Sequence, residues 1–173
     1  MALKKTVTCA TTMNRTSSTR RNLLTGALML TALPLLRPLA ALAQSESQAA
    51  PQMNVTKSPS CGCCKGWVDL ARQQGFSVSV TDTDDYEGMK TANAVPEALW
   101  SCHTAVIDGY VIEGHVPFAA IRTLLAERPD IAGLSVPGMP PDSPGMGGGA
   151  DAVVPVTAWG GTAGDGTPFE FKS

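Results

Sequence analysis

Hydrophobic and polar positions follow two different periods along the first part of the central region. Residues 53–57 and 76–80 alternate with a period of two, which is typical of strands with one buried face. Between them, residues 64–74 place Trp67 and other apolar side chains at helical spacing, and Gly75 follows as a stop signal. This pattern predicts a strand, a helix and a second strand.

The pattern that follows predicts a short helix, a β-hairpin and a longer helix, over residues 86–94, 104–113 and 117–128. An Asp108-Gly109 step between two short apolar runs is typical of a hairpin turn. Pro117 stands at the first helical turn, where proline is favoured. The order strand, helix, strand, helix, hairpin, helix predicts an α/β domain with a mixed sheet.

Glycine and proline dominate the chain from Gly133 onward, so we expect a loop there rather than a core element. Two apolar runs near the C-terminus, residues 153–159 and 168–171, are separated by a glycine-rich segment. They are candidates for one additional hairpin. We find no internal repeat.

The first 43 residues differ from the rest in composition and predict an export signal. Thr19-Arg-Arg-Asn-Leu-Leu24 resembles a twin-arginine signal, and an apolar run follows to about residue 42. Ala41-Leu-Ala43 offers the small-x-small pattern of a signal-peptidase site. Two prolines and an arginine interrupt the apolar run, which argues against a transmembrane anchor. We expect cleavage after Ala43 and a periplasmic mature protein.

The expected organisation has four parts: a cleaved leader over 1–43, a polar linker over 44–52, a compact domain over 53–133, and a Gly/Pro/Met-rich loop with a C-terminal hairpin over 134–173, packed on the same domain.

The leader holds six of the 13 Lys and Arg residues and none of the 15 Asp and Glu residues. The remainder is therefore strongly acidic. Such a surface repels nucleic acid and anionic lipid, so we expect neither nucleic acid nor membrane as a partner after cleavage.

Four cysteines beyond the leader carry the candidate chemistry: Cys61, Cys63, Cys64 and Cys102. An even number of cysteines in an oxidising compartment suggests two disulfides. Three cysteines within four residues would close almost no loop, so a purely structural role is disfavoured. The first three open a predicted helix, where the helix dipole and free N–H groups stabilise a thiolate as nucleophile or metal ligand.

Four thiolates suit a soft or borderline metal, Cu(I) first and zinc second. Cys63 and Cys64 are adjacent and should diverge, which is awkward for a single tetrahedral ion. A small cluster in which each sulfur bridges two copper ions would use this crowding better.

Cys61-Gly-Cys-Cys-Lys65 resembles the redox motif of the thioredoxin superfamily, with Cys61 and Cys64 at the CxxC spacing. The expected element order also fits that fold. In this superfamily the loop before the third strand lies against the motif and usually carries a cis-proline. The resemblance implies that Cys102 and His103 face the other cysteines. The cis-proline is missing here, which weakens the case for ordinary disulfide exchange.

Five motifs in one order carry a closer resemblance: Ser60-Cys-Gly-Cys-Cys64, Ser101-Cys-His-Thr104, Gly109-Tyr110, Glu113-Gly-His-Val-Pro117 and Val136-Pro-Gly-Met-Pro140. Together they are similar to the family of small exported bacterial proteins, long labelled as of unknown function, that includes the copper-resistance protein CopG. The resemblance covers residues 54–146. It implies a thioredoxin-like fold whose cysteines bind copper, in one site or a multi-copper cluster. It also implies a role in copper tolerance, with conversion between Cu(I) and Cu(II) and other periplasmic copper-handling proteins as partners.

Other residues are weaker candidates for the site. His103 directly follows Cys102, and His115 lies between the hairpin and the last helix; each is a candidate ligand or a structural histidine. Met139 and Met146 offer thioether sulfur that suits Cu(I), although loop packing is the favoured interpretation. We expect Glu113 to be a solvated strand residue, with orientation of a histidine as the alternative.

We therefore expect a periplasmic copper-binding protein that holds Cu(I) at the four cysteines. Whether it also acts as a copper oxidoreductase stays open. Two further hypotheses are a thiol–disulfide oxidoreductase and a structural zinc protein, which would unfold when the metal is chelated.

Overall fold

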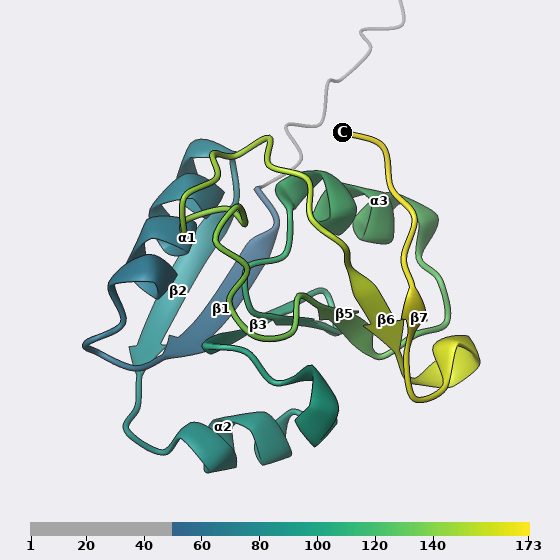
Figure 1. The fold of residues 1–173 in the computed structure, drawn as a ribbon, viewed down its shortest axis with the longest axis horizontal. Coiled ribbons are helices and arrows are strands. Elements are labelled where there is room, and N and C mark those ends of the chain that lie inside the picture. Colours follow the sequence, from purple (N-terminus) through teal and green to yellow (C-terminus); the bar gives the residue numbers. More distant parts are fainter. Residues whose placement is uncertain (1–49) are drawn as a thin grey trace, which may run out of the picture. The chain divides into compact units, whose positions relative to one another are not determined.

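The computed structural model describes residues 50–173 of the chain (Figure 1). The expected leader and most of the expected linker lie outside the described residues. No helix in the described part is long and apolar enough to cross a bilayer.

The described residues alternate between helices and strands. The α-helices are α1 (Gly62–Gln73), α2 (Tyr86–Ala92) and α3 (Phe118–Glu127), with 3-10 turns η1 (Glu97–Leu99) and η2 (Gly161–Ala163). The strands are β1 (Gln52–Lys57), β2 (Ser77–Asp82), β3 (His103–Ile107), β4 (Tyr110–Glu113), β5 (Gly133–Ser135), β6 (Thr157–Trp159) and β7 (Thr167–Pro168). The expected mixed α/β class is confirmed.

All seven strands form one mixed sheet, in the order β2-β1-β3-β4-β5-β6-β7. β1 is parallel to β2 and β4 is parallel to β5, whereas β3 is antiparallel to both of its neighbours. In the β1–β3 register Lys57 lies opposite His103. The end of β1 and the start of β3 are therefore neighbours, which brings the two cysteine-bearing segments to the same end of these strands.

The main core lies between one face of the sheet and helices α1 and α3. Trp67 of α1 and Phe118 of α3 are fully buried and stack with their ring centroids 5.3 Å apart. Alternate residues of β1, Met53 and Val55, point into this core. Burying each such side chain contributes about 1.5–3 kcal/mol.

Helix α2 covers the opposite face of the sheet, on the side away from α3 (Figure 1). The Lys90 ammonium of α2 donates a hydrogen bond to the Thr104 hydroxyl of β3, and Thr104 lies opposite Glu113 of β4. Successive residues of a strand point to opposite faces. The Thr104 side chain consequently turns toward α2, while the neighbouring residues His103 and Ala105 turn toward the main core.

The expectation of a loop from Gly133 onward is wrong for its first three residues. β5 is fully buried in the middle of the sheet, between β4 and β6. A Cβ at Gly133 would overlap the Val111 carbonyl and the Trp159 ring. Glycine thus permits close strand packing here, although in the sequence it predicts a loop.

The C-terminal segment forms a shorter hairpin than the apolar pattern predicts. β6 has three residues and β7 has two, and they pair antiparallel through two residue pairs, with η2 between them. Apolar residues just outside these two strands pack on the main core: Val154, Val156, Phe169 and Phe171. The Phe169 N–H still donates to the Val156 carbonyl oxygen at 2.9 Å.

Candidate metal centre

The CxCC segment follows β1 after a short turn and opens helix α1. Cys61 is the N-cap residue, and its sulfur accepts the Cys64 N–H at 3.3 Å. Sulfur therefore takes the place of the side-chain oxygen that usually satisfies a free N–H group at a helix start. The helix begins at Gly62, two residues before the predicted start, because this cap orders the motif itself.

Cys61 and Cys64 form a disulfide with their Cα atoms 5.4 Å apart. Cys63 and Cys102 are free thiols among the described residues, and the Cys63 sulfur lies 3.4 Å from that of Cys61. The structure thus shows an oxidised form of the CxxC pair. Because the thiolate is the metal-binding state of cysteine, Cys61 and Cys64 become ligands only after two-electron reduction.

The fourth cysteine reaches this segment from the loop that precedes β3. The Cys102 carbonyl oxygen lies 3.6 Å from the Cys64 sulfur. The sulfur atoms of all four cysteines, Cys61, Cys63, Cys64 and Cys102, lie within 4.8 Å of one another. This is the juxtaposition that the sequence resemblance implied, and it brings four soft donors to one point.

A second group of donor atoms overlaps the first. Cys64, Cys102, His103 and His115 also place one donor atom each within 4.8 Å of one another. Cys102 Sγ is 2.9 Å from His115 Nε2 and 3.6 Å from His103 Nδ1. The two imidazole rings meet edge to face, 5.0 Å apart. Cys64 and Cys102 are common to both groups.

Hydrogen bonding determines how His115 faces the site. Its Nδ1 lies 2.6 Å from the Pro144 carbonyl oxygen, which can only accept, so Nδ1 carries the proton. In the neutral ring the Nε2 lone pair therefore faces Cys102, whose S–H donates to it. Ligating histidines are typically oriented in this way by a carbonyl or carboxylate.

His103 presents a buried polar atom without a partner. It is fully buried between the Trp67 ring and His115, and its Nε2 makes no hydrogen bond with any residue in the range 50–173. An unsatisfied buried nitrogen is costly and is uncommon in folded proteins. A ring beside two sulfurs and a second imidazole fits the donor set of a soft or borderline metal.

Burial governs the protonation of this site in the absence of a metal. Burial and the nearby Cys63 thiol raise the pKa of Cys102 to about 12. Burial also lowers the pKa of His103 and of His115, and each histidine is consequently neutral near pH 7. A bound cation would reverse the preference of Cys102, because positive charge stabilises its thiolate.

The expectation of a solvated Glu113 is wrong. Its side chain is fully buried and forms an ion pair with the equally buried Lys90, with Oε1 and Nζ 2.5 Å apart. Its carboxylate accepts hydrogen bonds from the Ser101 N–H and the Thr104 hydroxyl rather than from a histidine. Sequence reasoning missed Lys90 entirely, because its partner is 23 residues away and no local pattern marks a buried lysine.

The two candidate methionines lie in different surroundings. Met139 is 58% exposed and, with Cys102, lines a hollow of about 220 Å³ that also includes Tyr86 and Trp100. Met146 is half-buried in the loop whose Gly145 packs against the Trp67 backbone. Met139 is therefore the methionine that shares a surface hollow with one of the four cysteines.

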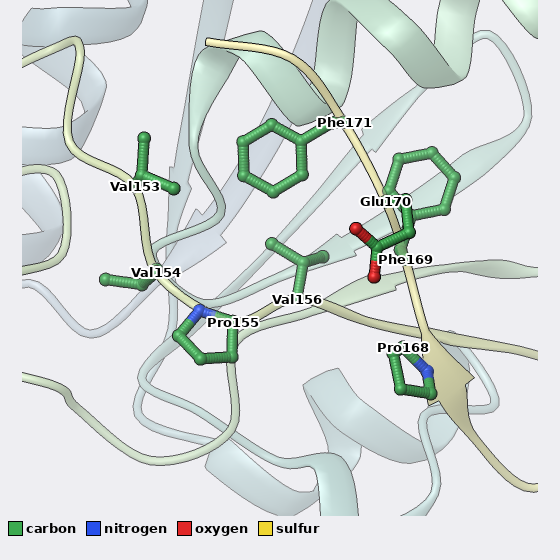
Figure 2. Close-up of a pocket in the computed structure, with 8 residues that line it drawn as sticks. All are labelled: Val153, Val154, Pro155, Val156, Pro168, Phe169, Glu170 and Phe171. Carbon is green, nitrogen blue, oxygen red and sulfur yellow. The ribbon is translucent and has the colours of Figure 1, made fainter.

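A larger hollow lies near the C-terminus, between residues 153–156 and 168–171 (Figure 2). Its walls are formed mainly by valine, proline and phenylalanine side chains, and Glu170 is their only ionisable group. It contains no sulfur or imidazole, so the cysteine cluster remains the candidate metal centre.

Comparison with known proteins finds a matching family model and similar solved structures. Residues 99–146 match a family described as "Protein of unknown function, DUF411". A search of curated proteins gave no match. Two solved structures are similar. The match to "Copper resistance protein copG- Form 2" has 37% sequence identity and a TM-score of 0.63, and it covers 72% of this chain and 99% of that protein's chain. The match to "Copper resistance protein copG- Form 1" has 38% sequence identity and a TM-score of 0.61, and it covers 70% of this chain and 96% of that protein's chain. This chain therefore belongs to the CopG-like family of copper resistance proteins.

Proposed function

We propose that this chain is a periplasmic copper-binding protein that acts in copper tolerance and holds Cu(I) through Cys61, Cys63, Cys64 and Cys102. One observation carries the proposal: four sulfur atoms from two separate segments lie within 4.8 Å of one another. The copper resistance proteins to which the chain is similar support the choice of metal.

The donor arrangement favours more than one copper ion. A structural zinc site is completed by four ligands. Here two four-ligand groups overlap and share Cys64 and Cys102. Shared sulfurs are suited to bridging neighbouring Cu(I) ions, while His103 and His115 supply nitrogen at one end of the cluster.

We assign the part from β1 to α3 to the thioredoxin-like class. The support is the strand order β2-β1-β3-β4 with β3 antiparallel to its neighbours, and a CxxC pair at the start of α1. The helices α1 and α3 cover one face of the sheet and α2 covers the other. In such a scaffold the loop before β3 lies against the CxxC motif, which accounts for the position of Cys102.

The Cys61–Cys64 pair also provides a chemical route for Cu(I)/Cu(II) conversion. Two thiols can give up two electrons and two protons to form one disulfide, and the electrons reduce two Cu(II) ions to two Cu(I) ions. The reverse reaction oxidises two Cu(I) ions while it opens the disulfide. The observed disulfide is the oxidised end of this couple. In that state Cys61 and Cys64 are not ligands, so Cys63, Cys102 and the two histidines would hold the Cu(I) until the pair is reduced again.

Anaerobic reconstitution of the reduced protein tests the proposal. We expect more than one Cu(I) per chain, with mainly sulfur neighbours in X-ray absorption spectra. A stoichiometry of one or less would contradict the cluster, and tighter binding of zinc than of Cu(I) would contradict the choice of metal.

The CxxC disulfide favours thiol–disulfide exchange as a second candidate function. Reduction of insulin in the presence of dithiothreitol separates the two. A dithiol oxidoreductase should turn over many insulin molecules per chain, whereas a copper-binding protein should not raise the rate above that of dithiothreitol alone.

A further inference from the structure

The loop that carries Cys102 is held on both sides by side chains that lie outside the donor groups. The Glu113 carboxylate accepts the Ser101 N–H at 2.6 Å and the Thr104 hydroxyl at 2.7 Å. The Tyr86 hydroxyl donates to the Ser101 carbonyl oxygen at 2.7 Å. Both backbone polar groups of Ser101 and the side chain of Thr104 are therefore fixed by residues of α2 and β4.

Lys90 completes this arrangement. Its ammonium group lies 2.5 Å from Glu113 Oε1 and 3.1 Å from the Thr104 hydroxyl, and 4.9 Å from the centroid of the Tyr86 ring. The Lys90 and Glu113 side chains are both fully buried. A buried ion pair often stabilises a fold no more than well-packed apolar residues would. Its bonds to the Cys102 loop give this pair a positional role that an apolar pair could not supply.

We propose that Lys90, Glu113 and Tyr86 form a clamp that positions Cys102 for metal binding. The clamp holds residues 101–104 so that the Cys102 sulfur stays beside Cys61, Cys63 and Cys64 before any metal arrives. These are positioning residues, because they act through the Cys102 loop and none belongs to either donor group. The effect on copper rests on the proposed function, while the effect on the loop does not.

Preorganised ligands bind more tightly because the protein does not have to order them during binding. Substitution of residues that orient metal ligands typically weakens metal affinity about 10–100-fold. We expect this range for loss of the clamp. Among the four cysteines the clamp contacts only the segment of Cys102, which makes the proposal testable by a double-mutant cycle.

The main variant is Lys90→Met/Glu113→Gln, which removes both charges at similar volume and leaves no single buried charge. Cu(I) affinity is measured by anaerobic competition with a chromogenic chelator. With Cys102 present, we expect affinity to fall about 10–100-fold. In a Cys102→Ala background the same double change should alter the remaining affinity by no more than about twofold, because the two sites then no longer couple. An equal loss in both backgrounds would overturn the proposal.

Leu124→Ala is the matched control for general destabilisation. Leu124 is fully buried in α3 and belongs to neither the donor groups nor the clamp. Its truncation leaves a cavity in the core, so it should clearly lower the denaturant midpoint of unfolding without changing Cu(I) affinity. If copper affinity instead falls with stability in both proteins, the clamp is only structural and the proposal fails.

A metal-free readout separates the clamp from the proposed function. In the disulfide form, Cys102 and Cys63 are alkylated with iodoacetamide and followed by peptide mass spectrometry. We expect loss of the clamp to speed alkylation of Cys102 about tenfold, as for the loss of one buried charged hydrogen bond, while Cys63 keeps its rate. An unchanged ratio of the two rates would overturn the proposal even if the protein binds no copper.

Tyr86→Phe keeps the test decisive if the double variant does not fold. Tyr86 is 43% exposed, so removal of its hydroxyl should leave the fold intact. The bond to the Ser101 carbonyl is lost, and the Cys102 to Cys63 alkylation ratio should rise by about threefold or more, as expected for one hydrogen bond. A ratio equal to that of the wild type would contradict the clamp.

Discussion

Cys102 and His115 form a thiol–imidazole pair at the point where the two donor groups overlap. The thiol keeps its proton because burial raises the pKa of Cys102 to about 12, and the His115 nitrogen 2.9 Å away accepts that proton in a hydrogen bond. The sequence motifs implied the position of Cys102. They left the role of His115 open, because its partner, the Pro144 carbonyl, lies 29 residues away in an irregular loop.

Substitution of Cys102 with serine should remove one of the two sulfurs, those of Cys64 and Cys102, that belong to both donor groups. We expect at least one Cu(I) fewer per chain and fewer sulfur neighbours in X-ray absorption, because a hydroxyl is a poor ligand for soft Cu(I). Cys9→Ser in the predicted leader is the control and should leave copper binding unchanged. Full copper loading of Cys102→Ser would show that this cysteine is not a ligand.

Met139 is expected to assist copper uptake rather than to hold copper at equilibrium. Its side chain is 58% exposed beside a hollow that Cys102 also lines. Met139→Leu keeps size and hydrophobicity but removes the thioether. We expect unchanged stoichiometry and slower transfer of Cu(I) from a chelator, measured by stopped flow, with half-buried Met146→Leu as the control. Loss of a bound ion in Met139→Leu would instead make Met139 a ligand.

At the scale of elements, periodicity predicts those that pack through several residues. Helix α3 shows its apolar face clearly over ten residues, and β1 alternates over six. β5 has only three residues, all buried, which is too short for a period to be visible. The buried ion pair between α2 and β4 was missed for a related reason, since charge in a sequence predicts exposure unless its distant partner is known.

Gly133→Ala tests the tight packing of β5. The added methyl would meet the Val111 backbone and the Trp159 ring. We expect the free energy of unfolding to fall by about 3 kcal/mol, because backbone leaves little room to relax. Gly149→Ala, where nothing lies within 4 Å of the new methyl, should change it by no more than about 0.5 kcal/mol. Equal values from denaturant unfolding of the two variants would contradict the buried position of β5.

At the scale of the whole molecule, four separate stretches of sequence form the candidate centre. The CxCC segment contributes three sulfurs, and the segment around the start of β3 contributes the sulfur of Cys102 and the nitrogen of His103. The segment between β4 and α3 contributes His115, and the Gly/Pro-rich loop around residue 144 contributes the carbonyl that orients it. The first two stretches were expected to meet because of a resemblance to the thioredoxin superfamily. The last was expected to be a loop, but glycine and proline content carries no information about which side chain the loop contacts.

The predicted export signal implies a place of action for the whole molecule, which can be tested. Arg20→Lys/Arg21→Lys keeps the charge but removes the arginine pair, so export by the twin-arginine route should fail and the uncleaved chain should stay in the cytoplasm. Lys4→Gln/Lys5→Gln is the control and should leave export intact. Cell fractionation and intact mass measurement decide this, and an uncleaved wild-type chain in the cytoplasm would contradict the prediction.

The hydrogen bond between His115 and the Pro144 carbonyl has a consequence for biosynthesis. A ribosome completes the CxCC segment, the Cys102 loop and His115 before it adds residue 144. Until then the chain lacks the carbonyl that accepts the Nδ1 proton of His115 and so turns Nε2 toward Cys102. A partly synthesised chain would thus hold all its sulfur donors but lack a correctly oriented imidazole, so the complete donor set matures only when translation is nearly finished.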